Sequence, residues 1–286
     1  QALKSKQKNY LRSQKVTVNK TSVGISTDLT SMTKSTGYGL RVEDKEISLN
    51  YPDAVKIIGV FESIDSNSPI LDKITLPSGL SLNTNAILGE KITGSTSDAI
   101  AQITGLISAT QVEIVYLTSD KFLIAEVVNF DESKISSTIQ SIDATSSLNI
   151  TNIFDLDKGQ RDQFYDYSRI VRKQNFAPPA RKLTIVFDRY DIPSNDNGDF
   201  YTIGSYDDER YSHDIPNIGN KNVRASDTID FRPRVAQYSG SESPFAFQNR
   251  TFASTINPSF IVTPNESSIL GYNYYLPRND KIILDT

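Results

Sequence analysis

The chain has 286 residues, enough for two domains or one large β domain, and its formal net charge of −4 argues against non-specific nucleic-acid binding, which needs a concentrated positive field. The absence of cysteine excludes disulfides, zinc–thiolate sites and cysteine nucleophiles, and the single histidine, His213, excludes histidine-pair metal sites. No apolar run approaches the roughly 20 residues that a membrane-spanning helix needs, so we expect no membrane span.

Residues 1–46 are predicted to form an extended basic arm and connector. The first 20 positions carry six basic side chains and no acid, and a Ser-, Thr- and Gly-rich stretch without periodicity follows. We expect a solvated arm that lies along an acidic neighbour. Nucleic-acid binding is the sharper alternative, but six charges in an acidic chain are a weak signal. Because the chain starts at Gln1 without a signal-peptide pattern and stops within a strand-like run, we expect a piece of a longer polypeptide.

Residues 47–156 are predicted to form a small β domain. The runs "AVKIIGVFESI", "QVEIVYL" and "KFLIAEVV" are rich in β-branched residues with a period of two, and turn formers separate them. They predict about six strands in a barrel or sandwich between residues 47 and 130. The run "AIAQI" fits either a short strand or one helical turn. Ile135, Ile139 and Ile142 suit one amphipathic helix, against which the many Ser and Thr residues argue.

The segment "DKGQRDQFYDYSRIVRK", residues 157–173, alternates basic and acidic side chains around three aromatic rings. Asp166 and Arg169 are three positions apart, a spacing at which opposite charges pair on a helix. The pattern suits buried aromatic rings with arginines that make bidentate contacts nearby. We predict that residues 157–176 form a stiff joint between two β domains.

Residues 177–286 are predicted to form a second β domain that continues beyond this sequence. The run "LTIVFDRYDI" alternates as a strand does, and Asn197-Gly198 is a type I′ hairpin signal. The same Asp- and Asn-rich loop invites calcium binding, but its spacing fails the EF-hand pattern. Most of the tyrosines and phenylalanines lie between residues 160 and 275, in long loops that are typical of an assembly component rather than a compact enzyme.

Patterns for catalysis are weak. A polysaccharide depolymerase needs two facing carboxylates, for which residues 207–209 or the pair Asp227 and Asp230 are candidates, but nothing nearby raises the pKa of one acid over another. His213 has Ser and Asp as immediate neighbours, and such neighbours cannot form a triad, whose members converge in space. We therefore predict no catalytic residue, no cofactor and no metal.

Protein contacts are the expected role of the arginines and tyrosines. The run "GYNYYLPR" gathers tyrosine rings that fill interfaces or, less commonly, stack on glycans. The candidate contact residues are Arg161, Tyr165, Tyr167, Arg169, Arg172, Arg232, Arg234, Tyr272 and Tyr274.

The strings "GQRDQFYDYSRIVRK", "APPARKLTIVFDRYDI", "GDFYTIGSY", "SDTIDFRPRV" and "VTPNESSILGYNYYLPRNDKIILDT" together resemble a large virion structural protein of contractile-tailed phages, particularly phages of cyanobacteria. This resemblance covers residues 155–286. The run "GEKITGSTSDAIAQITG" is more loosely similar to a small β module that recurs in phage tail and baseplate proteins.

The resemblance implies a tail or baseplate component of the virion, assembled in the host cytoplasm, that connects to or supports tail fibres. Its partners would be other tail and baseplate proteins and copies of itself in a symmetric homo-oligomer, with a trimer among the expected states. A receptor- or glycan-binding module of a fibre or spike is the alternative, with a host glycan as the less favoured partner, and a depolymerase is the second. The expected fold is all-β, with two small sandwich- or barrel-like domains, an N-terminal arm and long loops.

Overall fold

The computed structural model describes residues 2–19, 23–25, 32–34, 36–193, 196, 198–206, 214–219, 222–252, 265 and 267–272. The chain divides into two compact units. Unit 1 comprises Gln1–Asn9, Ile192–Arg232 and Ser254–Thr286, and unit 2 comprises Tyr10–Asp191 and Pro233–Ala253.

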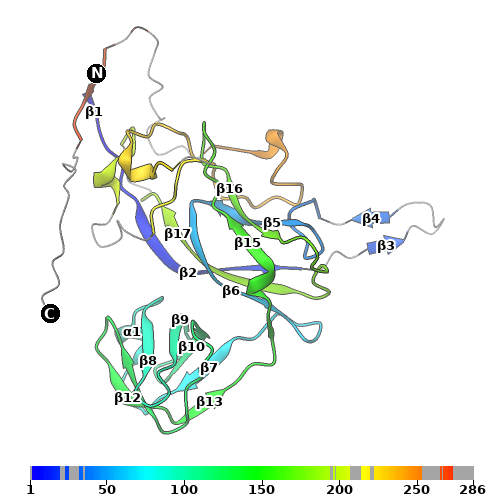
Figure 1. Cartoon of the computed structure of the whole chain (residues 1–286), viewed down its shortest axis with the longest axis vertical. Helices are drawn as coiled ribbons and strands as arrows, with labels where there is room; N and C mark the ends of the chain where they lie inside the picture. Colours follow the sequence, from blue (N-terminus) through cyan, green and yellow to red (C-terminus); the bar gives the residue numbers. More distant parts are fainter. Residues whose placement is uncertain are drawn as a thin grey trace, which may run out of the picture. The chain divides into compact units, whose positions relative to one another are not determined.

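The predicted all-β class is confirmed, because the regular structure of the described residues is almost entirely strand (Figure 1). The strands are β1 (Ala2–Leu3), β2 (Asn9–Val18), β3 (Val23–Ile25), β4 (Met32–Lys34), β5 (Glu46–Pro52), β6 (Ala54–Glu62), β7 (Asp72–Thr75), β8 (Lys91–Gly94), β9 (Ile100–Leu106), β10 (Gln111–Tyr116), β11 (Val127–Phe130), β12 (Ser136–Thr138), β13 (Ser141–Asp143), β14 (Leu148–Asn149), β15 (Phe154–Asp157), β16 (Tyr167–Arg172), β17 (Leu183–Asp191) and β18 (Ile269–Leu270). The helices are short: α1 (Leu82–Asn85), η1 (Thr151–Ile153), η2 (Ile203–Ser205), η4 (Ala225–Asp227) and η5 (Phe247–Asn249). None of them is long and apolar enough to cross a membrane.

Two sheets of unit 2 form a sandwich. Their strand orders are β14-β6-β17-β2 and β15-β16-β5, and side chains from both sheets share one core. Strand β17 is buried on both faces, because Leu183, Ile185 and Phe187 enter that core while Val186 packs on the opposite side against Phe61. Alternate residues of a strand point to opposite faces, so a strand covered on both sides needs the nearly continuous apolar run that this one has.

The strand pairing divides the chain differently from the predicted boundaries. Strand β17 of the predicted second domain pairs with β6 of the first, and β16 of the predicted joint pairs with β5. Strand β2, within the predicted extended arm, is a strand of the same sheet as β17. The physical reason is that a strand's local pattern fixes which face is buried but carries no information about which distant strand supplies its hydrogen bonds.

A small barrel, residues 72–143, is inserted between β6 and β14 (Figure 1). Its seven-stranded sheet has the order β12-β11-β8-β9-β10-β7-β13. The two outermost strands, β12 and β13, are separated in sequence only by Ile139 and Gln140, so the sheet closes on itself. The Ile139 N–H donates to the carbonyl of Glu126 and the Gln140 N–H to that of Thr75, each at the seam.

The barrel is all-β, as the predicted class requires, but it spans residues 72–143 rather than 47–130, and it decides two points that the sequence left open. The segment with Ile135, Ile139 and Ile142 is not a helix, because it provides β12 and β13, with Ile139 buried in the barrel core. The run "AIAQI" is strand β9 rather than a helical turn.

The barrel is built from two similar halves, residues 87–101 and 123–137. Strands β8 and β11 are antiparallel neighbours in which Thr93 faces its own equivalent, Asn129, which places a local pseudo-two-fold axis between them. The Glu90 carboxylate accepts hydrogen bonds from the backbone N–H groups of its own Ile87 and, in the other half, of Ser133 (2.8 Å) and Glu132 (3.1 Å).

Glu126 makes the equivalent set of contacts. It accepts the N–H of Leu123 in its own half and those of Thr96 (3.2 Å) and Ser97 (3.1 Å) in the other. Each glutamate therefore satisfies donors in both halves and ties them together.

Unit 1 has little regular structure among its described residues. Its N-terminal segment runs beside residues 198–206, where the Lys8 N–H donates to the carbonyl of Ser205 at 2.8 Å. The Lys8 ammonium lies 4.7 Å from the ring centroid of Tyr201 and 4.8 Å from that of Tyr206. Lys6 and Lys8 are buried, so this part of the basic arm is not solvated as predicted but packed on aromatic rings.

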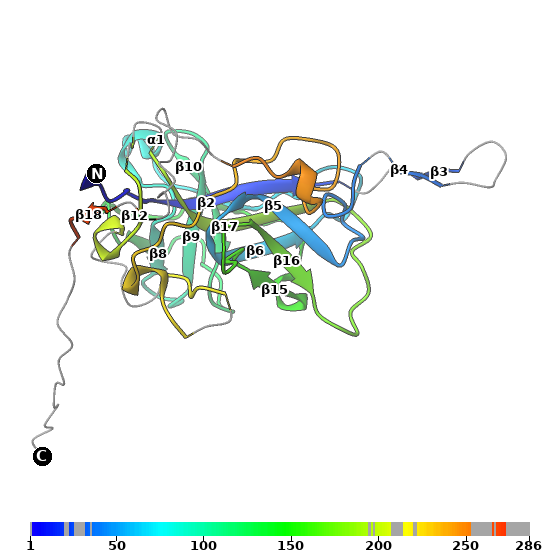
Figure 2. The ribbon, with the colours of Figure 1, turned by 90° about the horizontal axis from the view of Figure 1, so that it is seen from above.

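Farther along the arm, Arg12 and Lys15 form ion pairs with Glu132 and Glu113 of the barrel, an acidic neighbour within the same chain. The hairpin of β3 and β4 projects from the body of unit 2 in two perpendicular views (Figure 2). The hairpin turn predicted at Asn197 lies outside the described residues.

Candidate interaction site

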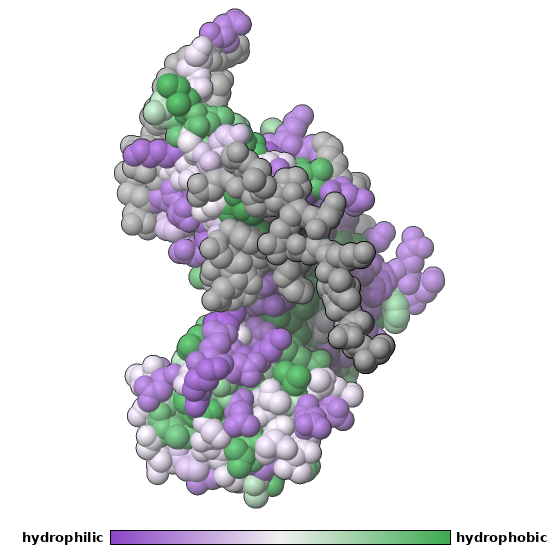
Figure 3. All heavy atoms as spheres, turned by 60° about the vertical axis from the view of Figure 1, so that its left-hand side comes forward, coloured by the Kyte–Doolittle hydropathy of each residue, from purple (hydrophilic) through white to green (hydrophobic). Residues whose placement is uncertain are grey.

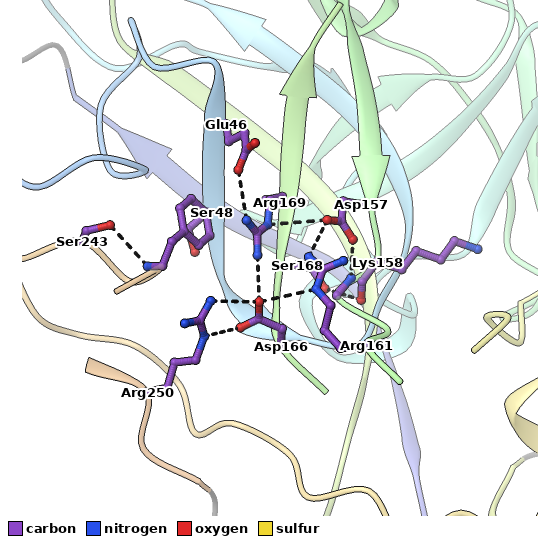
Figure 4. Close-up of polar contacts among 12 residues, drawn as sticks. Glu46, Ser48, Asp157, Lys158, Arg161, Asp166, Ser168, Arg169, Ser243 and Arg250 are labelled. Carbon is purple, nitrogen blue, oxygen red and sulfur yellow. Dashed lines mark hydrogen bonds and ion pairs between the residues drawn. The ribbon is translucent and has the colours of Figure 1, made fainter. Parts of the chain in front are cut away.

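The charged segment singled out in the sequence forms a network centred on Asp166 in unit 2 (Figure 4). The buried Asp166 carboxylate accepts a hydrogen bond from Arg169 Nη2 at 2.8 Å. Arg250 binds it in a bidentate way, with Nε 2.8 Å from Oδ1 and Nη2 3.1 Å from Oδ2. Arg161 Nε lies 3.5 Å from the same Oδ2. Three guanidinium groups therefore share one carboxylate.

Two further acids balance these arginines. Glu46 Oε2 lies 3.0 Å from Arg169 Nη1, and Asp157 Oδ2 lies 2.6 Å from Arg161 Nη2. Burial raises the pKa of Asp166, but the hydrogen bonds and charges of Arg250 and Arg169 outweigh burial and leave this pKa below its ordinary value. The network thus matches three arginines with three acids.

The network fastens the returning segment 233–252 to the sandwich. Arg250 comes from this segment, Arg169 from β16 and Glu46 from β5. The Tyr167 ring packs edge-on against Tyr238 of the returning segment, with centroids 5.7 Å apart. Backbone hydrogen bonds between Tyr165 and residues 233–235 complete the attachment.

An aromatic patch sits on this attachment, and we define it as the exposed Tyr38, Phe247 and Phe252 together with the partly buried Phe164 and Phe245. The Arg169 guanidinium lies 3.9 Å from the Phe245 ring centroid, and Phe245 packs edge-on against Tyr38 at 6.2 Å. Phe252 packs edge-on against Phe164 at 6.0 Å. Phe247 is 74% exposed, and Tyr38 and Phe252 are also exposed. Large apolar rings are therefore presented to solvent on a loop whose base is fixed by ion pairs.

Most of the predicted contact residues in the 157–173 segment face inward. Tyr165 and Tyr167 are completely buried, so neither ring is available to a partner, contrary to the role predicted for them. The returning segment 233–252 packs Tyr238 on the Tyr167 ring and hydrogen-bonds to the backbone of Tyr165. Arg161 and Arg169 belong to the Asp166 network, as their predicted bidentate and ionic contacts suggested, although the segment is a strand and turn rather than a helix.

The remaining candidates are distributed over both units. Arg172 donates to the backbone carbonyls of Glu43 (3.3 Å) and Asp44 (3.4 Å). Arg232 of unit 1 is partly buried and pairs with the buried Asp230, and Arg234 of unit 2 is buried. Tyr272 is exposed, and Tyr274 lies outside the described residues.

Sequence reasoning missed the exposed rings of Tyr38, Phe247 and Phe252. The run "SPFAFQNRTF" places three phenylalanines in one long polar loop, and that composition was the available signal. It could not indicate which rings are exposed, because Phe245 and Phe247, two positions apart in a loop, have no strand or helix period to separate their faces.

The acids considered for catalysis are engaged with arginines. Asp227 pairs with Arg224, with Oδ2 3.1 Å from Nε, and Asp230 pairs with Arg232 at 2.7 Å. Residues 207–209 and His213 lie outside the described residues. Within the described part of the chain, no group of three or more histidine, aspartate or glutamate side chains could hold a metal ion.

The barrel also presents apolar side chains to solvent, seen as green areas in the lower part of Figure 3. The exposed large aliphatic residues of the barrel are Ile87, Leu88, Ile107, Leu117, Leu123, Ile124 and Val127. Ile124, next to Leu123 in the loop before β11, is 65% exposed.

No protein-family model matches the chain, and comparison with curated proteins and with solved structures also finds no match.

Proposed function

We propose that this chain is a structural component of the tail of a contractile-tailed phage, in the baseplate or at the attachment of its fibres. It acts by protein–protein association as a homo-oligomer with other tail proteins and performs no catalysis. The proposal rests on the sequence resemblance given above and on the aromatic patch.

The aromatic patch has the chemistry of an interface centre. Aromatic rings and arginine are enriched at protein interfaces, and a few such side chains carry most of the binding energy. The exposure of Phe247 is the observation that carries the proposal. A ring that is 74% exposed adds little to the stability of the fold, and it offers apolar area that a partner protein can bury. The bidentate Arg250–Asp166 contact fixes the base of its loop, which lowers the conformational entropy lost on binding.

The test compares two phenylalanine substitutions of the same kind. Phe247→Ser should abolish incorporation of the chain into tail particles, or its self-association in sedimentation velocity, while the thermal unfolding midpoint stays within about 2 °C because the ring is exposed. Phe176→Ser, at another exposed phenylalanine of unit 2 outside the patch, is the matched control and should assemble normally. Normal assembly of Phe247→Ser would contradict the proposal.

Glycan binding is the second candidate, because exposed aromatic rings also stack on sugars. A glycan array probed with the purified chain should give no signal if the patch binds protein. A positive array that Phe247→Ser silences would assign the patch to a host glycan instead. Replacing Asp227 and Asp230 with Asn should leave any capsule-degrading activity of the preparation unchanged, since we propose no depolymerase site.

A further inference from the structure

Two buried arginines of unit 2, Arg189 and Arg234, share a single acidic partner. Arg189 Nη1 lies 3.0 Å from Asp191 Oδ1, and Arg234 Nη2 lies 3.1 Å from the same oxygen. Both groups also donate to the backbone carbonyl of Tyr190, at 3.4 Å and 2.9 Å. The two guanidinium groups therefore converge on one spot beside the end of β17.

Each guanidinium has unused donors at this spot. The Nε atoms of Arg189 and Arg234 are buried without a hydrogen-bond partner, although the residues are only 6% and 9% exposed. Nη2 of Arg189 and Nη1 of Arg234 also make no hydrogen bond to the described residues, but neither atom is fully buried, so these two donors reach solvent. Buried polar groups without a partner are rare in folded proteins, and each calls for a water, an ion or a ligand that satisfies it.

The charge balance distinguishes this cluster from the other arginine sites. The Asp166 network matches three arginines with three acids, and the buried pair of Arg41 and Asp44 is matched one to one. Here two cations face one carboxylate, whose side chain is partly exposed to solvent. The cluster therefore carries an excess positive charge in a poorly solvated place.

The local structure also holds the arginines in position. The Arg189 guanidinium lies 4.1 Å from the ring centroid of Tyr51, which fixes its plane. Burial lowers the pKa of Arg189; Asp191 opposes this effect, and the charge of Arg234 reinforces it. An added anion would relieve both the desolvation and the mutual repulsion of the arginines.

We propose that Arg189 and Arg234 form a binding site for one small oxyanion, either an inorganic anion such as phosphate or the carboxylate of an acidic side chain from a neighbouring protein. Guanidinium forks are suited to both ligands because each presents several N–H donors in a fixed plane. The site does not depend on the tail function proposed above, because the two convergent guanidinium groups belong to the fold of this chain.

The experiment follows the arginine Nε–H signals by NMR in the ¹⁵N-labelled chain at constant ionic strength. Phosphate and acetate are titrated separately against chloride. Saturable shifts of the Arg189 and Arg234 signals with acetate assign the site to carboxylates. Saturation with phosphate alone assigns it to inorganic anions. Shifts with neither anion overturn the proposal and leave water as the partner of both Nε atoms.

Two variants test which residues bind. Arg234→Gln should weaken the anion by about tenfold or more, as expected for the loss of a charged hydrogen bond. Arg181→Gln removes the same charge at an exposed arginine of unit 2 and should change the affinity less than about twofold. If both variants weaken anion binding equally, the binding depends only on the net charge of the chain, and the proposed site is refuted. If Arg234→Gln does not fold, selenate soaked into wild-type crystals must give an anomalous peak between the two guanidinium groups, and an empty map refutes the site.

Discussion

Gly39 lies directly beneath the aromatic patch, and Gly39→Ala tests whether the patch is held as the structure shows. Gly39 has φ +95°, and a Cβ added to it would lie 2.5 Å and 2.9 Å from two ring carbons of Phe245. The backbone cannot yield easily, because the Gly39 N–H donates to the Asp44 carboxylate at 2.7 Å and its carbonyl accepts the Ser48 N–H at 2.7 Å. The Phe245 ring must therefore move.

The size of the effect follows from what Phe245 would lose. An alanine in the left-handed region costs about 1–2 kcal/mol wherever it is placed. Displacing the ring also removes its contact with Arg169, worth about 0.5–2 kcal/mol, and its edge-on contact with Tyr38, worth about 0.5–1.5 kcal/mol. We expect Gly39→Ala to lower the free energy of unfolding by about 1–3 kcal/mol beyond the backbone term.

Two comparisons isolate this excess in urea denaturation followed by circular dichroism. Gly79 has φ +98° with no atom within 4 Å of an added Cβ, so Gly79→Ala measures the backbone term alone. In a Phe245→Ala background, Gly39→Ala should cost no more than Gly79→Ala, because the ring it would strike is gone. If Gly39→Ala and Gly79→Ala destabilise equally in the wild-type background, the ring contact does not hold the patch.

Two further predictions concern buried carboxylates. Burial raises the pKa of Glu126, but hydrogen bonds from Leu123 and Ser97 outweigh it and lower the pKa below its ordinary value. Because the pKa of Glu126 is lower in the folded chain than in the unfolded chain, its contribution to the free energy of unfolding is present at neutral pH and is lost as the pH falls through the folded pKa. Glu126→Gln should therefore weaken the pH dependence of stability, measured by denaturation between about pH 7 and pH 3. The completely buried Asp188 accepts the N–H of Ser13 and faces three further donors, so Asp188→Asn should lower the free energy of unfolding by about 2–4 kcal/mol. Asp155→Asn, at a side chain that is 70% exposed, should change it by less than about 0.5 kcal/mol, and equal effects of the two substitutions would contradict the buried role of Asp188.

Strands were predictable from the sequence where apolar and polar residues alternate within a single short run. The runs at β6, β10 and β17 were recognised because β-branched residues recur at the period of a strand. Their partners were not predictable, because the pairing of β17 with β6 joins residues more than a hundred positions apart. Buried rings were predicted for residues 157–173, but the segment that packs on Tyr167 was not, since it returns from residue 233 onward.

The internal repeat of the barrel shows how little sequence identity a shared geometry needs. Aligned on Glu90 and Glu126, the halves 87–101 and 123–137 have only this glutamate and the serine at 97 and 133 in common. The halves share a carboxylate that accepts backbone N–H groups, a buried aliphatic residue two positions after it (Ile92 and Val128), and left-handed residues at the same two turns. A comparison by residue identity alone therefore does not reveal the repeat.

The equivalent turns at Gly89 and Ala125 differ in how closely β2 packs against them and in how exposed their aliphatic side chains are. Gly89 has φ +83°, and a Cβ there would lie 2.2 Å from the Cβ of Arg12, so glycine is required where β2 packs. Its equivalent, Ala125, has φ +70° and carries a Cβ. The side chains before Ala125, Leu123 and Ile124, are also more exposed than their equivalents before Gly89. Both halves contact β2, since Arg12 also pairs with Glu132, but the close packing on β2 is at the Gly89 turn and the more exposed aliphatic side chains are at the Ala125 turn.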